Sequence, residues 1–185
     1  MASRGWPFRH TLEPMRKRLL VVDDDASIRH ALKKMLEAEG FDVTLAANGR
    51  EAEAQFRPDG TDLVILDLRL PGEAGWDIFE RLTRKNPTVP VIIITALSQQ
   101  NCMAKAAGAG ALLEKPLDVP VLLDTIAQLL SEPPVRRLRR LCGYDPDLRY
   151  VPAPGGPSFG LGDAGLPAAT PRLLSRPAPK PCLKP

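Results

Sequence analysis

The chain has 185 residues, of which 44% are hydrophobic and 25% charged, a balance typical of one soluble globular domain with extensions. No apolar run is long enough to span a membrane, and the basic N-terminus meets no apolar stretch before Leu19, which argues against a signal peptide. Cys102, Cys142 and Cys182 lack metal-ligand spacing and indicate free thiols. We therefore expect a cytoplasmic protein.

Basic and acidic residues are unevenly distributed along the chain. Residues 1 to 18 hold five of the 25 Lys and Arg residues and one of the 22 Asp and Glu residues, and residues 131 to 185 hold nine and four. The segment between them therefore keeps 11 basic and 17 acidic side chains, a net charge of −6. The sequence pI of about 8.9 reflects the two ends of the chain rather than its centre.

From residue 18 on, short apolar runs alternate with segments in which apolar residues recur at helical spacing. These patterns predict five strands, at 18–22, 41–46, 63–66, 91–94 and 111–114, and five helices, at about 26–38, 48–56, 75–85, 98–107 and 118–130. Such alternation is typical of a parallel sheet with helices on both faces. Residues 1–17 show no periodicity and are predicted to form a flexible N-terminal arm, in which Met15 is an alternative start to Met1.

Polar side chains follow four of the five predicted strands, at the point where each strand ends. They are an acidic run after the first strand, an acid after the third, a hydroxyl after the fourth and a cation after the fifth: Asp23, Asp24, Asp25, Asp67, Thr95 and Lys115. The carboxyl ends of parallel strands meet at one edge of a sheet, and ligands bind there. A carboxylate at the end of a buried strand is costly unless it is solvated, paired or bound to a metal.

Four segments carry a resemblance to a known family: Val21–Asp25, Leu66–Gly72, Ile94–Ala96 and Glu114–Pro116. In order and spacing they are similar to the motifs of the response-regulator receiver domain, the CheY-like phosphoacceptor module of two-component phosphorelay systems. The resemblance predicts a receiver domain at residues 18–131. It implies a flavodoxin-like, doubly wound (βα)5 parallel sheet with the strand order 2-1-3-4-5.

The resemblance also implies how a phosphoryl group is handled. Asp67 is expected to be the phosphoacceptor, as carboxylates are known covalent nucleophiles. Lys115 should pair with the phosphoryl oxygens as a compact point charge, and the hydroxyl of Thr95 should hydrogen-bond another of them, with Ala96 leaving space beside it. Pro116 resembles the family's position after a cis peptide bond.

A magnesium site is expected at the same edge of the sheet. By resemblance, its ligands are the side chains of Asp23, Asp24 and Asp67 and the backbone carbonyl of Arg69. Mg²⁺ is a hard cation that takes oxygen ligands and keeps several waters. The acidic run after the first strand also has a plainer interpretation as a helix N-cap, which we assign to Asp25.

One position departs from the family pattern. Leu112 stands on the fifth strand where the family often has Tyr or Phe, an aromatic ring that swings inward when the threonine engages the phosphoryl group. Leucine fills the space without a ring or hydroxyl. We hypothesise a reduced structural response on the face made by the fourth helix, fifth strand and fifth helix, through which a homodimer is also possible.

Composition changes after residue 131. Residues 131 to 185 hold 12 of the 20 prolines and 6 of the 14 glycines, together with a cluster of arginines at 136, 137, 139 and 140. We interpret residues 132–185 as a largely disordered tail rich in Pro, Gly and Arg. A short helix around 135 to 141 could follow a break at Pro133 and Pro134.

The leading hypothesis is a single-domain response regulator that is not a substrate-turnover enzyme. It would accept a phosphoryl group on Asp67 from a histidine kinase or histidine phosphotransfer protein and act on a downstream protein that the sequence does not name. The tail has no helix-turn-helix or zinc-ligand pattern, so we expect neither DNA nor membrane binding. Alternatives are a DNA-associated regulator using the basic tail and a phosphorylation-independent partner-binding module. A haloacid-dehalogenase-like phosphatase would need an aspartate where this chain has Arg69.

Overall fold

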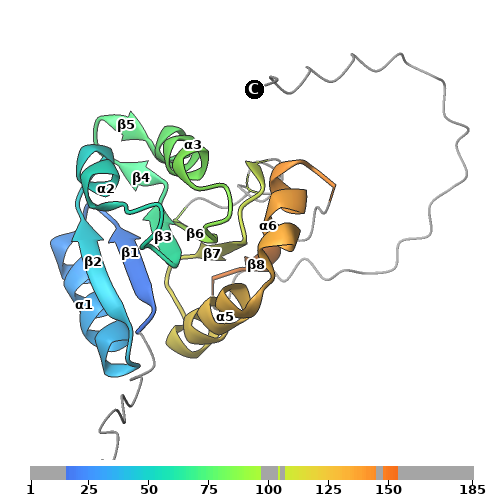
Figure 1. The fold of residues 1–185 in the computed structure, drawn as a ribbon. Coiled ribbons are helices and arrows are strands. Elements are labelled where there is room, and N and C mark those ends of the chain that lie inside the picture. The colour runs from blue at the N-terminus through green and yellow to red at the C-terminus, as the bar shows by residue number, and fades with distance from the viewer. Residues whose placement is uncertain (1–15, 97–103, 105–106, 145–147, 154–185) are drawn as a thin grey trace, which may run out of the picture.

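A computed structural model describes residues 16–96, 104, 107–144 and 148–153 of the chain (Figure 1). Six parallel strands form one sheet in the order β2-β1-β3-β6-β7-β8. Their bounds are β1 Arg18–Val22, β2 Asp42–Ala46, β3 Leu63–Asp67, β6 Val91–Thr95, β7 Ala111–Glu114 and β8 Arg149–Val151. The order of the first five is the predicted flavodoxin-like one, and β8 is an addition to it.

Helices connect the parallel strands and cover both faces of the sheet. They are α1 Ala26–Ala38, α2 Gly49–Gln55, α3 Gly75–Lys85, α5 Val119–Ser131 and α6 Pro134–Leu141. The predicted bounds of α1, α2, α3 and α5 agree with these to within about one residue. Most of the predicted helix at 98–107 lies outside the described residues. None of the helices in the described ranges combines the length and apolar character needed to cross a bilayer.

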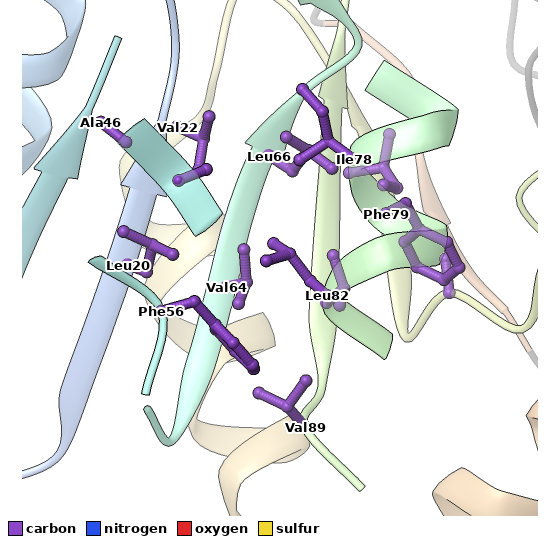
Figure 2. Close-up of a cluster of buried hydrophobic side chains, with 14 of the residues drawn as sticks. Leu20, Val22, Ala46, Phe56, Val64, Leu66, Ile78, Phe79, Leu82 and Val89 are labelled. Atoms are coloured by element: carbon purple, nitrogen blue, oxygen red, sulfur yellow. The ribbon is translucent and has the colours of Figure 1, made fainter. Parts of the chain in front are cut away.

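Two hydrophobic clusters, one on each face, hold the helices to the sheet. On one face, apolar side chains of β1 and β3 pack against α2 and α3, and Figure 2 shows Val64 and Leu66 of β3 pointing toward Leu82 and Ile78 of α3. On the other face, Val21 and its neighbours pack against α1 and α5. Burial on both faces explains why the strand sequences read as continuous apolar runs.

The strand register aligns the polar residues at the carboxyl edge. Val22 pairs with Leu66, so the residues that follow them, Asp23 and Asp67, come side by side. Asp67 pairs in turn with Ile94 of β6. On the far side of β6, Thr95 pairs with Glu114 of β7. The sheet therefore brings the predicted strand-end residues to one edge, as expected from the order of the strands.

A small hairpin follows the third strand where the sequence predicted only a loop. Arg69–Leu70 (β4) pairs antiparallel with Glu73–Ala74 (β5), and the turn between them contains Gly72 at a φ of +81°. The chain then passes close to itself: a Cβ on Gly75 would lie 2.5 Å from the Cα of Leu68. Glycine therefore permits the tight return from the strand end into α3.

The C-terminal part corrects one expectation. Residues 132–185 were predicted to be largely disordered, apart from a short helix around 135 to 141. Pro134–Leu141 forms that helix, α6, and Arg149–Val151 forms β8, which was not predicted (Figure 1, orange). Proline at the first helical position is compatible with a new helix after a break. The side chains of Leu141, Leu148 and Tyr150 pack against the core cluster on the α3 side. Tertiary contacts therefore stabilise this segment. Residues 1–15 and 154–185, for which an arm and a tail were predicted, lie outside the described residues.

Candidate functional site

Three carboxylates gather at the carboxyl edge of the sheet. Asp23 directly follows β1 and Asp67 ends β3, and their exposed fractions are only 2% and 3%. Asp24 is exposed beside them, and carboxylate oxygens of the three side chains lie within 4.8 Å of one another. The structure therefore brings together all three predicted side-chain ligands of the magnesium site.

Lys115 joins the two buried carboxylates. Its Nζ donates to Asp23 Oδ2 at 2.8 Å and to Asp67 Oδ2 at 2.5 Å. The backbone holds it there, because the N–H of Lys115 donates to the carbonyl oxygen of Thr95 at 2.8 Å. Thr95 itself is fully buried at the end of β6. The peptide bond between Lys115 and Pro116 is cis, as the family resemblance implied.

Burial and the charged neighbours of each side chain set the protonation states of Asp67 and Lys115. Burial raises the pKa of Asp67, and the negative charge of Asp23 acts in the same direction against the hydrogen bonds from Lys115 and Arg69. Burial alone would lower the pKa of Lys115, but its hydrogen bonds to Asp23 and Asp67 outweigh that effect and raise it. One ammonium group is thus held protonated between two carboxylates.

Backbone N–H groups hydrogen-bond to the second carboxylate oxygen of Asp67 and of Asp23. The N–H of Arg69 donates to Asp67 Oδ1 at 2.8 Å, which puts the backbone of Arg69 next to the predicted acceptor. The N–H of Asp25 donates to Asp23 Oδ1 at 2.8 Å. Asp25 is the N-cap of α1, as predicted, and accepts from the backbone N–H of Ser27 at 2.7 Å. These bonds orient the carboxylates before any ligand arrives.

The donor set of the pocket fits a divalent cation. Three carboxylates and the single ammonium group of Lys115 carry a formal charge of −2 among them. Carboxylate oxygen is the ligand type that Mg²⁺ and other hard divalent cations prefer. Asp23, Asp24 and Asp67 are therefore the residues that would hold such an ion.

Two positively charged side chains with defined partners were not predicted, and one of them, Arg29, contacts a residue of the pocket. Arg29 of α1 donates to the backbone carbonyl of Asp23 at 2.5 Å. Arg81 of α3 forms ion pairs with Glu73 of the hairpin and with Glu53 of α2. No motif marks either residue. The spacing of Arg29, four positions after the N-cap residue Asp25, is the one sequence signal that points toward the pocket.

The arginine cluster is largely engaged in internal contacts. Arg140 is 5% exposed and forms a bidentate ion pair with Glu132. Arg137 donates to the backbone carbonyls of Thr88 at 2.9 Å and Leu129 at 2.6 Å. Two of the four clustered arginines thus have internal partners, which makes them less available to a nucleic-acid backbone while α6 keeps this position.

Solved structures share this fold and part of the sequence. A CheY-like receiver domain protein from Methanospirillum hungatei superimposes with a TM-score of 0.59 at 33% identity, covering 62% of this chain and 94% of that one. The response regulator TrrA from Thermotoga maritima, solved in complex with Mg²⁺ and BeF, gives a TM-score of 0.57 at 34% identity, covering 61% and 98%.

Curated relatives match over the same region. ZraR, a transcriptional regulatory protein of Salmonella typhimurium, is 38% identical over 115 residues, which is 61% of this chain and 26% of that protein. MtrA, a DNA-binding response regulator of Mycobacterium tuberculosis, is 44% identical over 85 residues, or 46% and 37%. The chain therefore spans about a quarter to a third of the length of these relatives.

The family model described as the response regulator receiver domain matches residues 19–127, more than half of the chain. Phosphorylation and Mg²⁺ binding are general features of that family. Together with the sheet order and the acidic edge, this match places the chain among two-component signalling proteins. The chain belongs to the response regulator receiver domain family.

Proposed function

We propose that Asp67 accepts a phosphoryl group and that Lys115 and Thr95 assist the transfer. The observation that carries this proposal is the position of Lys115 Nζ, which lies within hydrogen-bond distance of both Asp23 and Asp67. A cation held beside a buried carboxylate can neutralise charge on incoming phosphoryl oxygens. Phosphoryl transfer depends mainly on such positioning and charge stabilisation.

In the proposed reaction, a carboxylate oxygen of Asp67 attacks the phosphorus of the donor. A new phosphorus–oxygen bond forms as the bond to the leaving group breaks, and the leaving group keeps the electron pair. With a phosphohistidine donor the leaving group is imidazole, and with acetyl phosphate it is acetate. Lys115 turns toward the new phosphoryl oxygens, and the hydroxyl of Thr95 donates to one of them.

Mg²⁺ is the proposed cofactor. Asp23, Asp24 and Asp67 would hold it, with the backbone carbonyl of Arg69 as a further ligand. When bound, the ion supplies charge neutralisation for the phosphoryl oxygens. The net negative charge of this donor set supports the role, because it disfavours the approach of a phosphoryl anion without a cation.

The proposed donor is a histidine kinase or a histidine phosphotransfer protein, and the phosphorylated state is passed on by altered protein binding, with no substrate turned over. A cytoplasmic location is proposed with this role. The alternative of DNA binding through the arginine cluster is disfavoured, since Arg137 and Arg140 already contact Thr88, Leu129 and Glu132. MtrA and ZraR are named as regulators of transcription, but the matched part is the receiver.

Intact mass spectrometry after incubation with Mg²⁺ and acetyl phosphate tests the proposal. Wild type and Asp42→Asn, which changes an exposed aspartate of β2, should each gain the mass of one phosphoryl group. Asp67→Asn should gain none, and omission of Mg²⁺ should abolish the gain in the other two. A phosphoryl group on Asp67→Asn, or none on wild type, would contradict the assignment.

A further inference from the structure

The last described segment of the chain extends the sheet beyond the five strands that were predicted. β8 lies parallel to β7, with Ala111 opposite Arg149, Leu112 opposite Tyr150 and Leu113 opposite Val151. The side chains alternate across the sheet, so Tyr150 joins the core cluster on the α3 side and Val151 the cluster on the α5 side. β8 thus occupies the edge that β7 would otherwise present to solvent.

Helix α6 and polar contacts hold this segment in place. Arg140 of α6 is paired with Glu132, and Arg137 donates to carbonyls at Thr88 and Leu129. Arg149 of β8 donates to Asp124 of α5 at 2.8 Å. The extension therefore binds the receiver through both of its elements, α6 and β8.

One contact of the extension leads to the acceptor pocket. The hydroxyl of Tyr150 donates to Glu114 Oε1 at 2.8 Å, and the backbone N–H of Ala153 donates to Glu114 Oε2 at 3.4 Å. Glu114 pairs in register with Thr95 and directly precedes Lys115, which contacts Asp67. Glu114 and Lys115 share a peptide bond, so a change in the β7 backbone that accompanies a shift of Lys115 would reach Glu114 and its contacts.

We propose that residues 132–144 and 148–153 form an intramolecular cap that closes the β7 edge, and that Tyr150 ties this cap to the acceptor pocket through Glu114 and Lys115. The partner that fits the uncapped edge is a protein segment in extended conformation, which would pair with Ala111–Leu113 in place of β8. The cap is an internal competitor for that partner. The link to phosphorylation rests on the proposed function of Asp67, whereas the cap itself does not.

Hydrogen exchange of the full chain without phosphoryl donor tests the cap. Tyr150→Phe keeps the ring and removes the hydroxyl, and loss of one such hydrogen bond should raise exchange of the β7 and β8 amides about fivefold. Tyr144→Phe is the matched control, because Tyr144 belongs to the same extension but is 80% exposed. Unchanged exchange in Tyr150→Phe, or an equal increase in Tyr144→Phe, would overturn the cap.

A peptide with the sequence of residues 148–153 probes the competition. Its apparent affinity should scale with the fraction of molecules whose cap is open, so it should bind Tyr150→Phe about fivefold more tightly than wild type. Equal affinity for the two proteins would show that β8 does not compete for this edge, and would overturn the proposed partner chemistry.

The coupling is tested with Mg²⁺ and acetyl phosphate, following exchange and intact mass in the same samples. Wild type should gain one phosphoryl group and exchange its β8 amides faster, and Asp67→Asn should do neither. A phosphorylated wild type with unchanged β8 exchange would overturn the coupling alone. An unshifted mass would overturn the proposed function and the coupling with it, while the Tyr150→Phe comparison still decides the cap.

Discussion

At the scale of single residues, the pocket concentrates negative charge that one lysine balances in part. Asp23 and Asp67 are buried next to each other, and both depend on Lys115 for compensation. The raised pKa of Asp67, caused first by burial and then by Asp23, means that ionising this carboxyl weakens the fold. A neutral side chain of the same shape should remove that cost.

We therefore expect Asp67→Asn to be more stable than wild type in Mg²⁺-free buffer near neutral pH, by a few degrees in Tm. A change of about 1 kcal/mol shifts Tm by roughly 2–4 °C in a chain of this size. Since the folded-state pKa of Asp67 lies above the unfolded value of 3.8, the wild type loses stability as pH rises through the raised pKa. The advantage of the variant should thus vanish in acid.

Thermal melts across the acidic to neutral range measure this difference. Asp42→Asn, on the exposed side of β2, should follow wild type throughout. Adding Mg²⁺ should reduce the advantage of Asp67→Asn, because the cation compensates the same charge in wild type. An Asp67→Asn variant that is less stable than wild type at neutral pH without Mg²⁺ would contradict this view of the pocket.

At the scale of elements, α6 lies so close to the loop before β7 that one position there must be glycine. Gly108 has a φ of +79°, and a Cβ placed on it would lie 2.8 Å from the Cα of Leu141. Gly40, after α1, has a similar φ of +86° but nothing within 4 Å of its Cβ position. Substitutions at these two glycines therefore allow the cost of backbone strain to be measured apart from the cost of steric contact.

Gly40→Ala is expected to cost about 1 kcal/mol of unfolding free energy, the price of a left-handed conformation for alanine. Gly108→Ala should cost roughly 1–3 kcal/mol more, because it also forces the backbone of α6 away from the loop. Urea denaturation of both variants measures the difference. Equal costs would mean that α6 does not pack at this position in solution.

What the sequence could predict of these elements follows from how each one is stabilised. The sequence pattern alone predicts β1, β3 and β6, because strands buried on both faces are apolar runs that end in polar residues. The parallel arrangement then brought Asp23, Asp67, Thr95 and Lys115 to one edge. β8 has only three residues, and the hairpin at Arg69–Ala74 has two-residue strands. Such short elements are stabilised by contacts with residues distant in sequence. Composition and periodicity therefore do not predict them.

At the scale of the whole molecule, the sixth strand changes which surface is available for association. A homodimer through the fourth helix, β7 and α5 was one expectation from the resemblance to receiver domains. In the structure β8 covers the outer edge of β7, so a second copy would have to displace Tyr150 and Val151 from the core clusters. We therefore expect no dimer to form through this edge while β8 is paired with β7.

Light scattering on the full, unphosphorylated chain is expected to give the mass of one chain, 20.2 kDa, at concentrations of tens of micromolar. Partial dissociation of a dimer would appear as a mass that rises with concentration. A stable mass of twice the chain, retained in Tyr150→Phe, would show association through another surface and would contradict the expectation that the closed cap keeps the protein monomeric.

The position of β8 also bears on how this protein would tolerate being shortened. A version that ended before Arg149 would uncover the row of backbone groups on β7, whose residues Ala111–Leu113 are buried and apolar. An unpaired apolar strand edge is a template for uncontrolled aggregation between chains. We therefore expect that proteolytic loss of β8 would raise the tendency of the chain to associate with other copies.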